Sequence, residues 1–581
     1  MHRQAHPIRR SLIARLVTLA VATTSLLVAT PAMPAAAAVT PGATKYVPIE
    51  PTRIARNFDS GASPAFGYTT ISSSTMRVTV TDRTGVPAGA IAAVVNITAI
   101  SNVGPGFVSV YPSATTRPNS SNLNLDKTGR RIANLAHVRL GTDGAFDLYR
   151  SKAFQVIVDL VGVYVPVTDT VSEGRFVARP GGAIRALDTR QAAGSATNPT
   201  GIGRFAATST ASVNLAPFGV PNDASAVVIG LTAVNANLGY WTTFATGTTR
   251  PVTSSQNIDT PLQTRAAQAI VALTGQASID VYSHGGGDLV IDVVGWYTGA
   301  GGPRSQDGLF LPRAPSRRLD TRQIRSLAPW GGSTYEFTIP NPPSCTNCLA
   351  GAVLNVTATQ PWTNGYVTAY PAGQPRPSTS TLNINAWPQT IANHAIIGIT
   401  TRGGAVYTLA GAHLIVDLAG VFLGTPLAAT NPKPANPNYL PNVATRVYSS
   451  QVPVNVGIRT GSNLDYIADQ GYAAGWSGLT NVAARGNTML FGHRTAAGAP
   501  FRYLEQFDVN EKFVIVGTDG KRYEYLVMDK RVVRPDYSTI LAIASPFGTV
   551  TAQLVACSKA DGSPTSLSYR IVITGRLVRV F

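Results

Sequence analysis

The chain has 581 residues, of which 44% are hydrophobic and 13% are charged, and its formal net charge is +18 at pH 7. This composition excludes a disordered protein, and the length exceeds what a single hydrophobic core supports, so we expect several domains. The basic charge suits an anionic partner. No nucleic-acid-binding motif is visible and the Lys and Arg residues are scattered. We therefore expect a soluble basic exterior, an anionic cell-envelope polymer as the best-fitting specific partner, and no nucleic acid.

The first 38 residues are predicted to be a secretory signal peptide. Arginines are frequent up to Arg15, the stretch Leu16–Thr30 is uncharged and mostly apolar, and a run of alanines ends at Ala38. Small residues of this kind suit signal peptidase. We expect cleavage near Ala38 and a location at the extracellular cell surface or cell wall. The alternative is an uncleaved signal that anchors the chain in the membrane, since no charge appears from Leu16 to past Ala38. No other stretch of the sequence is predicted to be long enough to span a bilayer.

Three copies of one unit follow, at residues 42–167, 174–299 and 308–424. The clearest marker of each copy is an apolar strand with an aspartate inside it, at Asp159, Asp292 and Asp417. Val, Ile and Thr runs alternate with turn residues in each copy, and this spacing predicts about seven or eight short strands per copy in a β-sandwich or a related module. Each copy is long enough to bury its own core, so the pattern predicts tandem domains rather than a solenoid. The copies resemble tandem β-domains of exported actinobacterial proteins.

The aspartate of the repeated strand allows two interpretations. It is either a ligand for a metal or a sugar, or a buried carboxylate that backbone donors or a nearby arginine satisfy. The arginine considered is that of the Asp-Thr-Arg element, Arg190 in the second copy and Arg322 in the third. One isolated acid between apolar residues favours the structural interpretation, and no metal site is predicted.

Three cysteines are present. Cys345 and Cys348 lie in a Pro-rich loop, whereas a thioredoxin-like motif opens a helix after a strand. No second cysteine pair or histidine stands at zinc-ligand spacing. In an exported protein a local disulfide between them is the better interpretation. Cys557 is then left unpaired, which makes it a candidate nucleophile.

A Pro-rich linker is predicted at residues 425–450, centred on Asn431–Pro437, and it precedes a last domain at residues 451–581. That domain is predicted to be a small closed β-barrel with short helices near residues 463–470 and 500–507. It contains one histidine, His493, and one cysteine, Cys557. A nucleophilic thiol needs a neighbouring cation and an acid/base, and an oxyanion formed by its attack needs a charged donor. Cys557, His493 and Arg570 meet these needs if the barrel brings them together.

The last domain resembles the sortases, the cysteine transpeptidases of Gram-positive cell surfaces. Six segments carry the resemblance in order: Val452–Ile458, Gly486–Arg494, Pro500–Leu504, Gly520–Tyr525, Leu554–Cys557 and Arg570–Gly575. The second contains the histidine motif, the fifth the cysteine motif and the last the arginine strand. The sequence departs from the family at Ala556, where sortases usually have threonine, and this leaves substrate preference open. Arg576 is a second candidate arginine, but Arg570 is the one that matches the family motif.

The resemblance implies a mechanism without a cofactor or a metal. Cys557 attacks a Leu-Pro-x-Thr-Gly-like sorting signal of a secreted protein, Arg570 stabilises the oxyanion, and His493 exchanges protons with the leaving and entering amines. The thioester on Cys557 is then resolved by an amine on a cell-wall precursor or protein, or by water.

Other functions remain open at this point. The first is a surface adhesin or envelope-glycan-binding protein with a degenerate barrel, against which the intact Cys, His and Arg set weighs. The second is an L,D-type transpeptidase, which resembles Ser-x-Gly-Cys at the nucleophile, whereas Leu554–Cys557 reads Leu-Val-Ala-Cys. A substrate of another sortase is disfavoured because no hydrophobic tail follows. Finally, Leu440–Ala444 superficially resembles a sorting signal and is either a lid over the groove or, more simply, linker.

Overall fold

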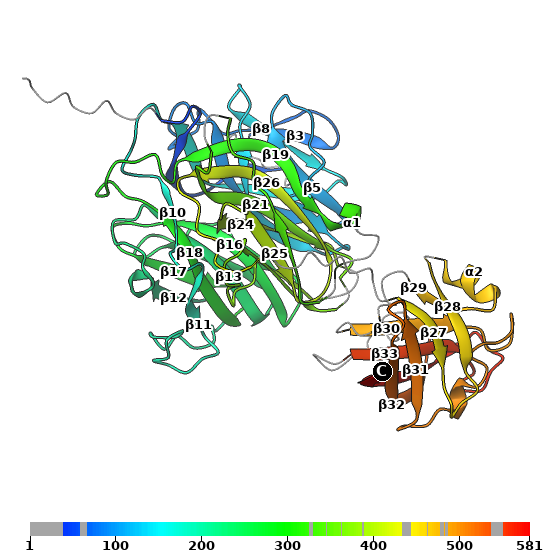
Figure 1. Cartoon of the computed structure of the whole chain (residues 1–581). Coiled ribbons are helices and arrows are strands. Elements are labelled where there is room, and N and C mark those ends of the chain that lie inside the picture. Colours follow the sequence, from blue (N-terminus) through cyan, green and yellow to red (C-terminus); the bar gives the residue numbers. More distant parts are fainter. Residues whose placement is uncertain are drawn as a thin grey trace, which may run out of the picture. The chain divides into compact units, whose positions relative to one another are not determined.

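The computed structural model describes residues 39–58, 67–324, 329, 331–343, 346–361, 363–385, 389–432, 443–461, 463–476, 482, 486–535 and 550–581. The predicted signal peptide, Cys345 and most of the Leu440–Ala444 segment lie outside these residues. Within them, strands dominate and helices are few and short (Figure 1). No helix in these ranges has both the length and the apolar character needed to cross a membrane.

The first repeat is a sandwich of two antiparallel layers. The inner layer consists of β1 (Thr44–Arg56), β9 (Gln155–Pro166), β4 (Ala92–Ile100) and β7 (Arg131–Arg139), in that order. The outer layer consists of β2 (Tyr68–Thr70), β3 (Thr75–Thr79), β8 (Ala145–Arg150), β5 (Gly106–Pro112) and β6 (Leu123–Leu125). Apolar side chains of both layers form one buried cluster between them, as expected for two sheets packed face to face.

The second repeat has the same plan. One layer contains β10 (Phe176–Ala178), β18 (Asp288–Tyr297), β13 (Ala226–Ala236) and β16 (Gln263–Ala272), with β11 (Ile184–Asp188) also paired to β18. The other contains β12 (Ser209–Asn214), β17 (Ser278–Ser283), β14 (Gly239–Ala245) and β15 (Gln256–Ile258). A 3-10 turn, η2 (Ala216–Phe218), follows β12 and contributes the buried Phe218 to the core.

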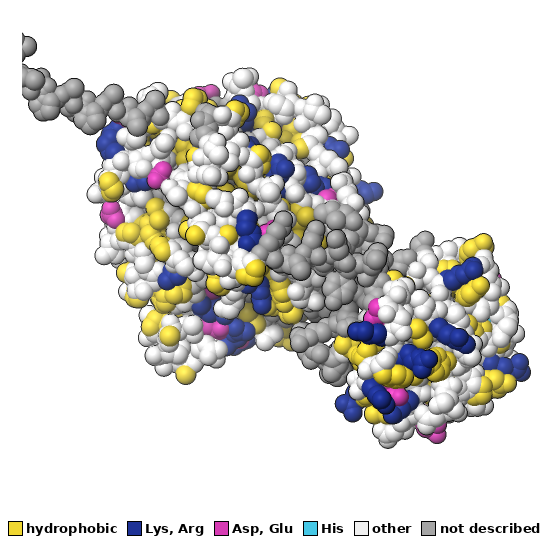
Figure 2. Space-filling model, in the orientation of Figure 1, with side chains coloured by type: hydrophobic (Ala, Val, Ile, Leu, Met, Phe, Trp, Pro, Cys, Tyr) yellow, Lys and Arg dark blue, Asp and Glu magenta, His cyan; other side chains and the backbone are white. Residues whose placement is uncertain are grey.

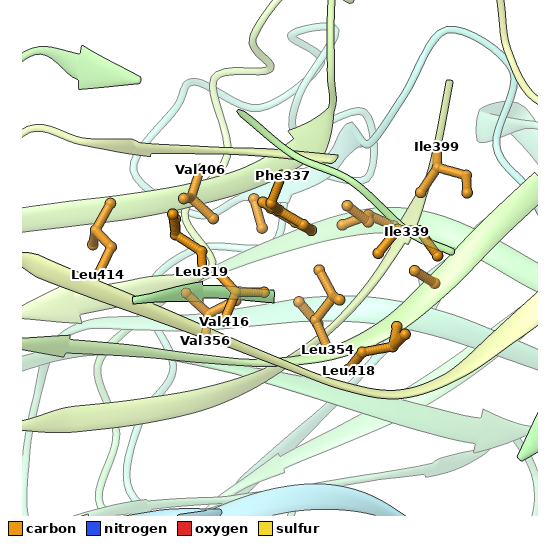
Figure 3. Packing of buried hydrophobic residues seen from close by; sticks show 14 of the residues in the cluster. Leu319, Phe337, Ile339, Leu354, Val356, Ile399, Val406, Leu414, Val416 and Leu418 are labelled. Atoms are coloured by element: carbon orange, nitrogen blue, oxygen red, sulfur yellow. The ribbon is translucent and has the colours of Figure 1, made fainter. Parts of the chain in front are cut away.

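The third repeat completes the set. One layer contains β19 (Phe310–Asp320), β26 (His413–Leu423), β21 (Leu349–Thr359) and β24 (Ile391–Gly398). The other contains β20 (Ser333–Phe337), β25 (Gly404–Thr408), β22 (Gly365–Pro371) and β23 (Leu382–Ile384). The one-turn helix α1 (Thr321–Ile324) follows β19. Figure 3 shows Leu354 and Val416 of one layer packed with Phe337 and Val406 of the other. These paired layers agree with the nearly all-β fold that the sequence predicts.

The three repeats share a further core, which the sequence did not predict. Each contributes an aromatic residue from its first strand and another from its Asp-containing strand: Tyr46 and Tyr164, Phe176 and Tyr297, Phe310 and Phe422. Rings from different repeats pack in turn, with centroids 4.2 Å apart for Tyr46 and Tyr297, 4.5 Å for Phe176 and Phe422, and 4.3 Å for Tyr164 and Phe310. Repeat one thus contacts repeat two, two contacts three, and three contacts one. We call this closed set of contacts the three-repeat cycle.

The repeated aspartates are buried and ion-paired, as the structural interpretation expected. Their partners are the arginines directly across the strand pair: Arg53 for Asp159, Arg185 for Asp292 and Arg317 for Asp417. The expected partners, Arg190 and Arg322, instead bind Asp188 and Asp320. Antiparallel register decides this, because residues directly opposite lie on the same face of the sheet. The paired arginines also close the cycle, donating to the carbonyls of Val252, Ser378 and Asn119 in the next repeat.

A buried polar chain runs through the centre of the three-repeat cycle. Nδ1 of His394 lies 2.8 Å from Oε1 of Gln268, and Nε2 of His394 lies 3.0 Å from Nδ1 of His137. Nε2 of His137 lies 3.0 Å from the Tyr164 hydroxyl. Burial lowers the pKa of His394 to about 3. Burial and the neighbouring His394 lower the pKa of His137 well below its usual value. Both imidazoles are neutral links between repeats.

The C-terminal domain is the closed barrel that the sequence predicted. Its strands follow the order β27 (Ala444–Tyr448), β28 (Asn455–Gly461), β29 (Ala473–Trp476), β30 (Gly486–Gly492), β33 (Val550–Ser558), β34 (Tyr569–Val580), β32 (Arg522–Val533) and β31 (Lys512–Gly517). Two short helical segments, α2 (Leu464–Asp469) and η3 (Leu504–Gln506), lie where helices were expected. Because β27 pairs with both β28 and β31, the barrel begins before residue 451, inside the segment expected to be linker.

Basic side chains are spread over the surface. Figure 2 shows Lys and Arg scattered across the visible face, with fewer Asp and Glu between them. This distribution agrees with the scatter along the sequence and provides no single basic patch on that face.

Candidate active site

Cys557 lies one residue before the end of β33, and its thiol is free and partly exposed. Residues before it alternate into the barrel core, where Leu554 and Ala556 are buried. The antiparallel pairing of β33 with β34 sets Arg570 directly opposite Cys557. Directly opposed residues present their side chains on one face with Cβ atoms about 5 Å apart. The pairing therefore brings the predicted thiol and guanidinium to one end of the barrel sheet.

His493 comes to the same end from the other neighbour of β33. The strand β30 runs parallel to β33 with Gly492 opposite Ala556. His493 directly follows the end of β30, and Cys557 is the next residue of β33, so the two lie at the same level of the barrel. The backbone carbonyl of His493 accepts a hydrogen bond from the Phe501 N–H at 3.0 Å, which holds the turn after β30.

The guanidinium of Arg570 uses only one of its nitrogens for hydrogen bonds to the described residues. Its Nη1 donates to the carbonyls of Leu567 and Tyr569 at 2.8 and 2.9 Å. Its Nε and Nη2 make no hydrogen bond to any described residue. The competing candidate, Arg576, lies opposite Thr551, six residues along the strand and about 20 Å away at about 3.3 Å per residue. Register therefore favours Arg570 as the arginine beside the thiol.

Asp469 is a member of the site that the sequence did not single out. Its Oδ1 lies 2.8 Å from Nε2 of His493. Asp469 is the last residue of α2, whose first turn is capped by the Asn463 side chain accepting from the Tyr466 N–H. The helix therefore carries a carboxylate to the imidazole. No short-range sequence signal marked this pairing, because 24 residues separate the two.

Arg494 is the second residue missed. Its side chain is only 1% exposed, and it donates to the Gly562 carbonyl at 2.7 Å and, more weakly, to the Cys557 carbonyl at 3.4 Å. It also binds the Arg502 carbonyl and the Glu505 carboxylate. Burial lowers the pKa of Arg494, while Glu505 and Cys557 oppose that shift. The sequence signal that could have indicated Arg494 is its charge directly after His493.

The arrangement brings a thiol, an imidazole and a guanidinium to neighbouring strand ends. It offers no group of three His, Cys, Asp or Glu side chains fit for a metal ion anywhere in the described ranges. Elsewhere, Cys348 is disulfide-bonded, in keeping with the predicted local disulfide, although Cys345 lies outside the described residues.

Comparisons with known proteins concern this domain. Residues 446–578 match the family model described as the sortase domain. Among solved structures, sortase E1 from Streptomyces coelicolor is 21% identical, with 24% of this chain and 90% of that chain covered and a TM-score of 0.21. The SrtA sortase from Actinomyces oris is 17% identical (25% and 89% covered, TM-score 0.21), and sortase C-1 from Actinomyces oris is 22% identical (24% and 76% covered, TM-score 0.21). No curated protein matches the chain. The family-model match, over the residues that form the closed barrel, identifies the C-terminal domain as a sortase domain.

Proposed function

We propose that the C-terminal domain is a cell-surface cysteine transpeptidase that cleaves a Leu-Pro-x-Thr-Gly-like sorting signal and transfers it to an amine. The observation that carries the proposal is the strand register, which sets Arg570 opposite Cys557 and brings His493 alongside it. The family match supports the same chemistry.

The proposed reaction has two steps. The Cys557 thiolate attacks the threonine carbonyl of the peptide, and the free donors of Arg570 bind the oxyanion that forms. When the C–N bond breaks, His493 gives its proton to the leaving amine and a thioester remains on Cys557. An entering amine then attacks the thioester, loses a proton to His493, and releases the new amide and the thiolate. Asp469 orients the imidazole throughout.

Incubation with a panel of Leu-x-x-Thr-Gly peptides and a free amine tests the proposal. We expect a thioester on Cys557 by mass spectrometry, amide product with the amine, and neither in Cys557→Ala. A Cys557→Ala protein that still cleaves the peptides would end the proposal. Failure of every peptide to acylate the native chain would favour the degenerate barrel of a surface adhesin.

The two arginines provide a matched comparison. Arg570→Ala is expected to lower the acylation rate by about 10²- to 10³-fold, the usual loss for one oxyanion donor. Arg576→Ala removes the same charge from the same strand and is expected to leave the rate unchanged. Equal losses in the two variants would contradict the assignment of Arg570.

A further inference from the structure

The junctions of the three-repeat cycle are built alike, but one lacks a side chain. In the first repeat Asn96 stands across the strand pair from Asp159, and in the third Asn355 stands across from Asp417. The same place in the second repeat, across from Asp292, is Gly230. The second junction thus lacks the –CH₂–CO–NH₂ group that the other two contain.

That side chain has a defined role in the other junctions. The Nδ2 of Asn96 donates to the Ser254 carbonyl of the second repeat, and the Nδ2 of Asn355 donates to the Ser121 carbonyl of the first at 2.7 Å. The corresponding serine of the third repeat is Ser380. Its carbonyl accepts no hydrogen bond from any residue that the structure describes.

Two further polar atoms at this junction are also unused. Both carboxylate oxygens of Asp159 and of Asp417 accept hydrogen bonds from their arginines. Asp292, itself only 2% exposed, accepts from Arg185 through Oδ1 alone, and its Oδ2 accepts none within the described ranges. The Oε1 of Gln268 is occupied by His394 and the Ile396 N–H, whereas its Nε2 donates to no described residue.

A cavity occupies the place of the missing side chain. It has a volume of about 120 Å³, and Gly230, Gln268, Asp292 and Ser380 all line it. The cavity at the first junction, where Asn96 is present, has only about 20 Å³. At the third junction a cavity of about 310 Å³ lies near Arg317 and does not reach Asn355. A cavity of about 150 Å³ is enough to hold benzene, so this one has room for a group of four or five heavy atoms.

We propose that this cavity binds the acetamido group of an N-acetylated amino sugar, which replaces the amide that Gly230 lacks. The ligand N–H donates to the Ser380 carbonyl or to Oδ2 of Asp292, and the ligand carbonyl accepts from Nε2 of Gln268. An acetamido group presents the same donor and acceptor as an asparagine side chain. The sugar ring then lies at the rim, where Pro375 and Pro377 offer apolar surfaces. Arg179, Gln374 and Thr379 line the same cavity and offer polar groups for the sugar hydroxyls.

Saturation-transfer NMR with the full chain and N-acetylglucosamine tests this site. We expect the acetyl methyl protons to receive the strongest saturation, because they enter the cavity, and glucose and glucosamine to receive none. Nε-acetyl-lysine carries the same acetamido group on a protein side chain and is expected to bind at least tenfold more weakly. Absence of methyl saturation in the native chain overturns the site, and tighter binding of Nε-acetyl-lysine overturns the sugar assignment.

Gly230→Asn restores the side chain of the other junctions and should abolish the signal. A Cβ at this position meets nothing closer than 3.6 Å, so the variant is expected to fold. If asparagine nevertheless disturbs the junction, Gly230→Ala is the smaller change to test, and it should weaken binding. Gly203→Asn makes the same substitution in the same repeat at an exposed place with no atom within 4 Å, and should bind normally. Undiminished binding in Gly230→Asn contradicts the proposal. Cys557→Ala should also bind normally, since a loss there would move the sugar to the thiol site.

Discussion

Arg494 shows how one buried cation can hold several loops of an active site. Its guanidinium joins the Cys557 strand, the Gly562 turn, the Arg502 carbonyl and the Glu505 carboxylate. We therefore expect Arg494 to act as a positioning residue that holds the backbone on which the thiol is carried.

Arg494→Met keeps the volume of the side chain but removes its charge and donors. We expect the free energy of unfolding of the barrel to fall by about 2 kcal/mol, because buried carbonyls lose their donor, and the acylation rate at Cys557 to fall with it. Urea unfolding and mass spectrometry measure the two effects. Arg446→Met, at an exposed site on β27, is the control. Partial rescue of the rate by Arg494→Lys is expected, and an unchanged rate in Arg494→Met would leave this arginine a purely structural role.

Asp469→Asn tests the partner of His493. The amide keeps the size of the carboxylate but not its charge, so we expect kcat to fall by about tenfold, less than the 10²- to 10⁴-fold typical of a lost acid/base. KM should not change, because Asp469 acts through the imidazole. The neighbouring acid of the same helix, Asp465, makes no hydrogen bond to His493 within the part of the chain that the structure describes, and it is the control. A kcat equal to that of the native chain would exclude an orienting role.

At the scale of elements, the end of β30 positions the histidine. Gly492 packs so closely on Phe501 that an added Cβ would lie 2.7 Å from the ring. Its lack of a side chain therefore lets the ring cover the strand end just before His493. The same close packing makes the position sensitive to even a methyl group.

Gly492→Ala is expected to destabilise the barrel by about 1–3 kcal/mol through overpacking and to slow acylation by displacing His493. Thermal unfolding and single-turnover acylation measure the two effects. Gly457→Ala on β28, where an added Cβ meets Tyr472 at 3.4 Å, is the matched control and should be tolerated. Equal stability of the two variants would contradict the overpacking argument.

The sequence predicted these elements better than their pairings. The repeated apolar strands and the barrel follow from alternation and turn residues, and they are confirmed. The partners of Asp159, Asp292 and Asp417 could not be predicted, because they depend on strand register and not on sequence distance. Asp469 escaped notice because it reaches His493 from α2, 24 residues away in the sequence. Arg494 was visible beside His493, but nothing local indicated that its guanidinium would be buried.

At the scale of the whole molecule, the buried histidines make the three-repeat cycle sensitive to acid. The Gln268 Oε1 can only accept, so the neutral tautomer of His394 donates through Nδ1 and accepts from His137 through Nε2. A second proton on His394 would sit on Nε2 and point at the Nδ1–H of His137, so two donors would face each other. The chain of hydrogen bonds therefore holds only while both rings are neutral.

This arrangement predicts a pH window for stability. The pKa of His394 falls from about 6.5 when unfolded to about 3 when folded, so the unfolded chain binds more protons between these values. Stability is thus complete above about pH 6.5 and declines toward pH 3, by on the order of 2 kcal/mol at pH 5 for this group. Thermal unfolding at each pH measures it. In the double variant His137→Ile/His394→Leu, each histidine is replaced by the residue at the same place in another repeat, Ile270 and Leu135, respectively. Its stability should depend less on pH. His284→Ala, at an exposed histidine, should keep the native slope.

The three-repeat cycle also fixes how many copies the chain can hold. A stacked array lengthens or shortens by one unit while its neighbours keep their contacts. In a ring of head-to-tail contacts, the angle at each junction fixes the number of copies that closes the ring. A fourth copy would find no free contact surface, and two copies would leave a contact surface of each uncovered. Such a segment diversifies by substitution inside its copies and not by gain or loss of copies. Gly230, standing where the other two repeats have asparagine, is one such divergence.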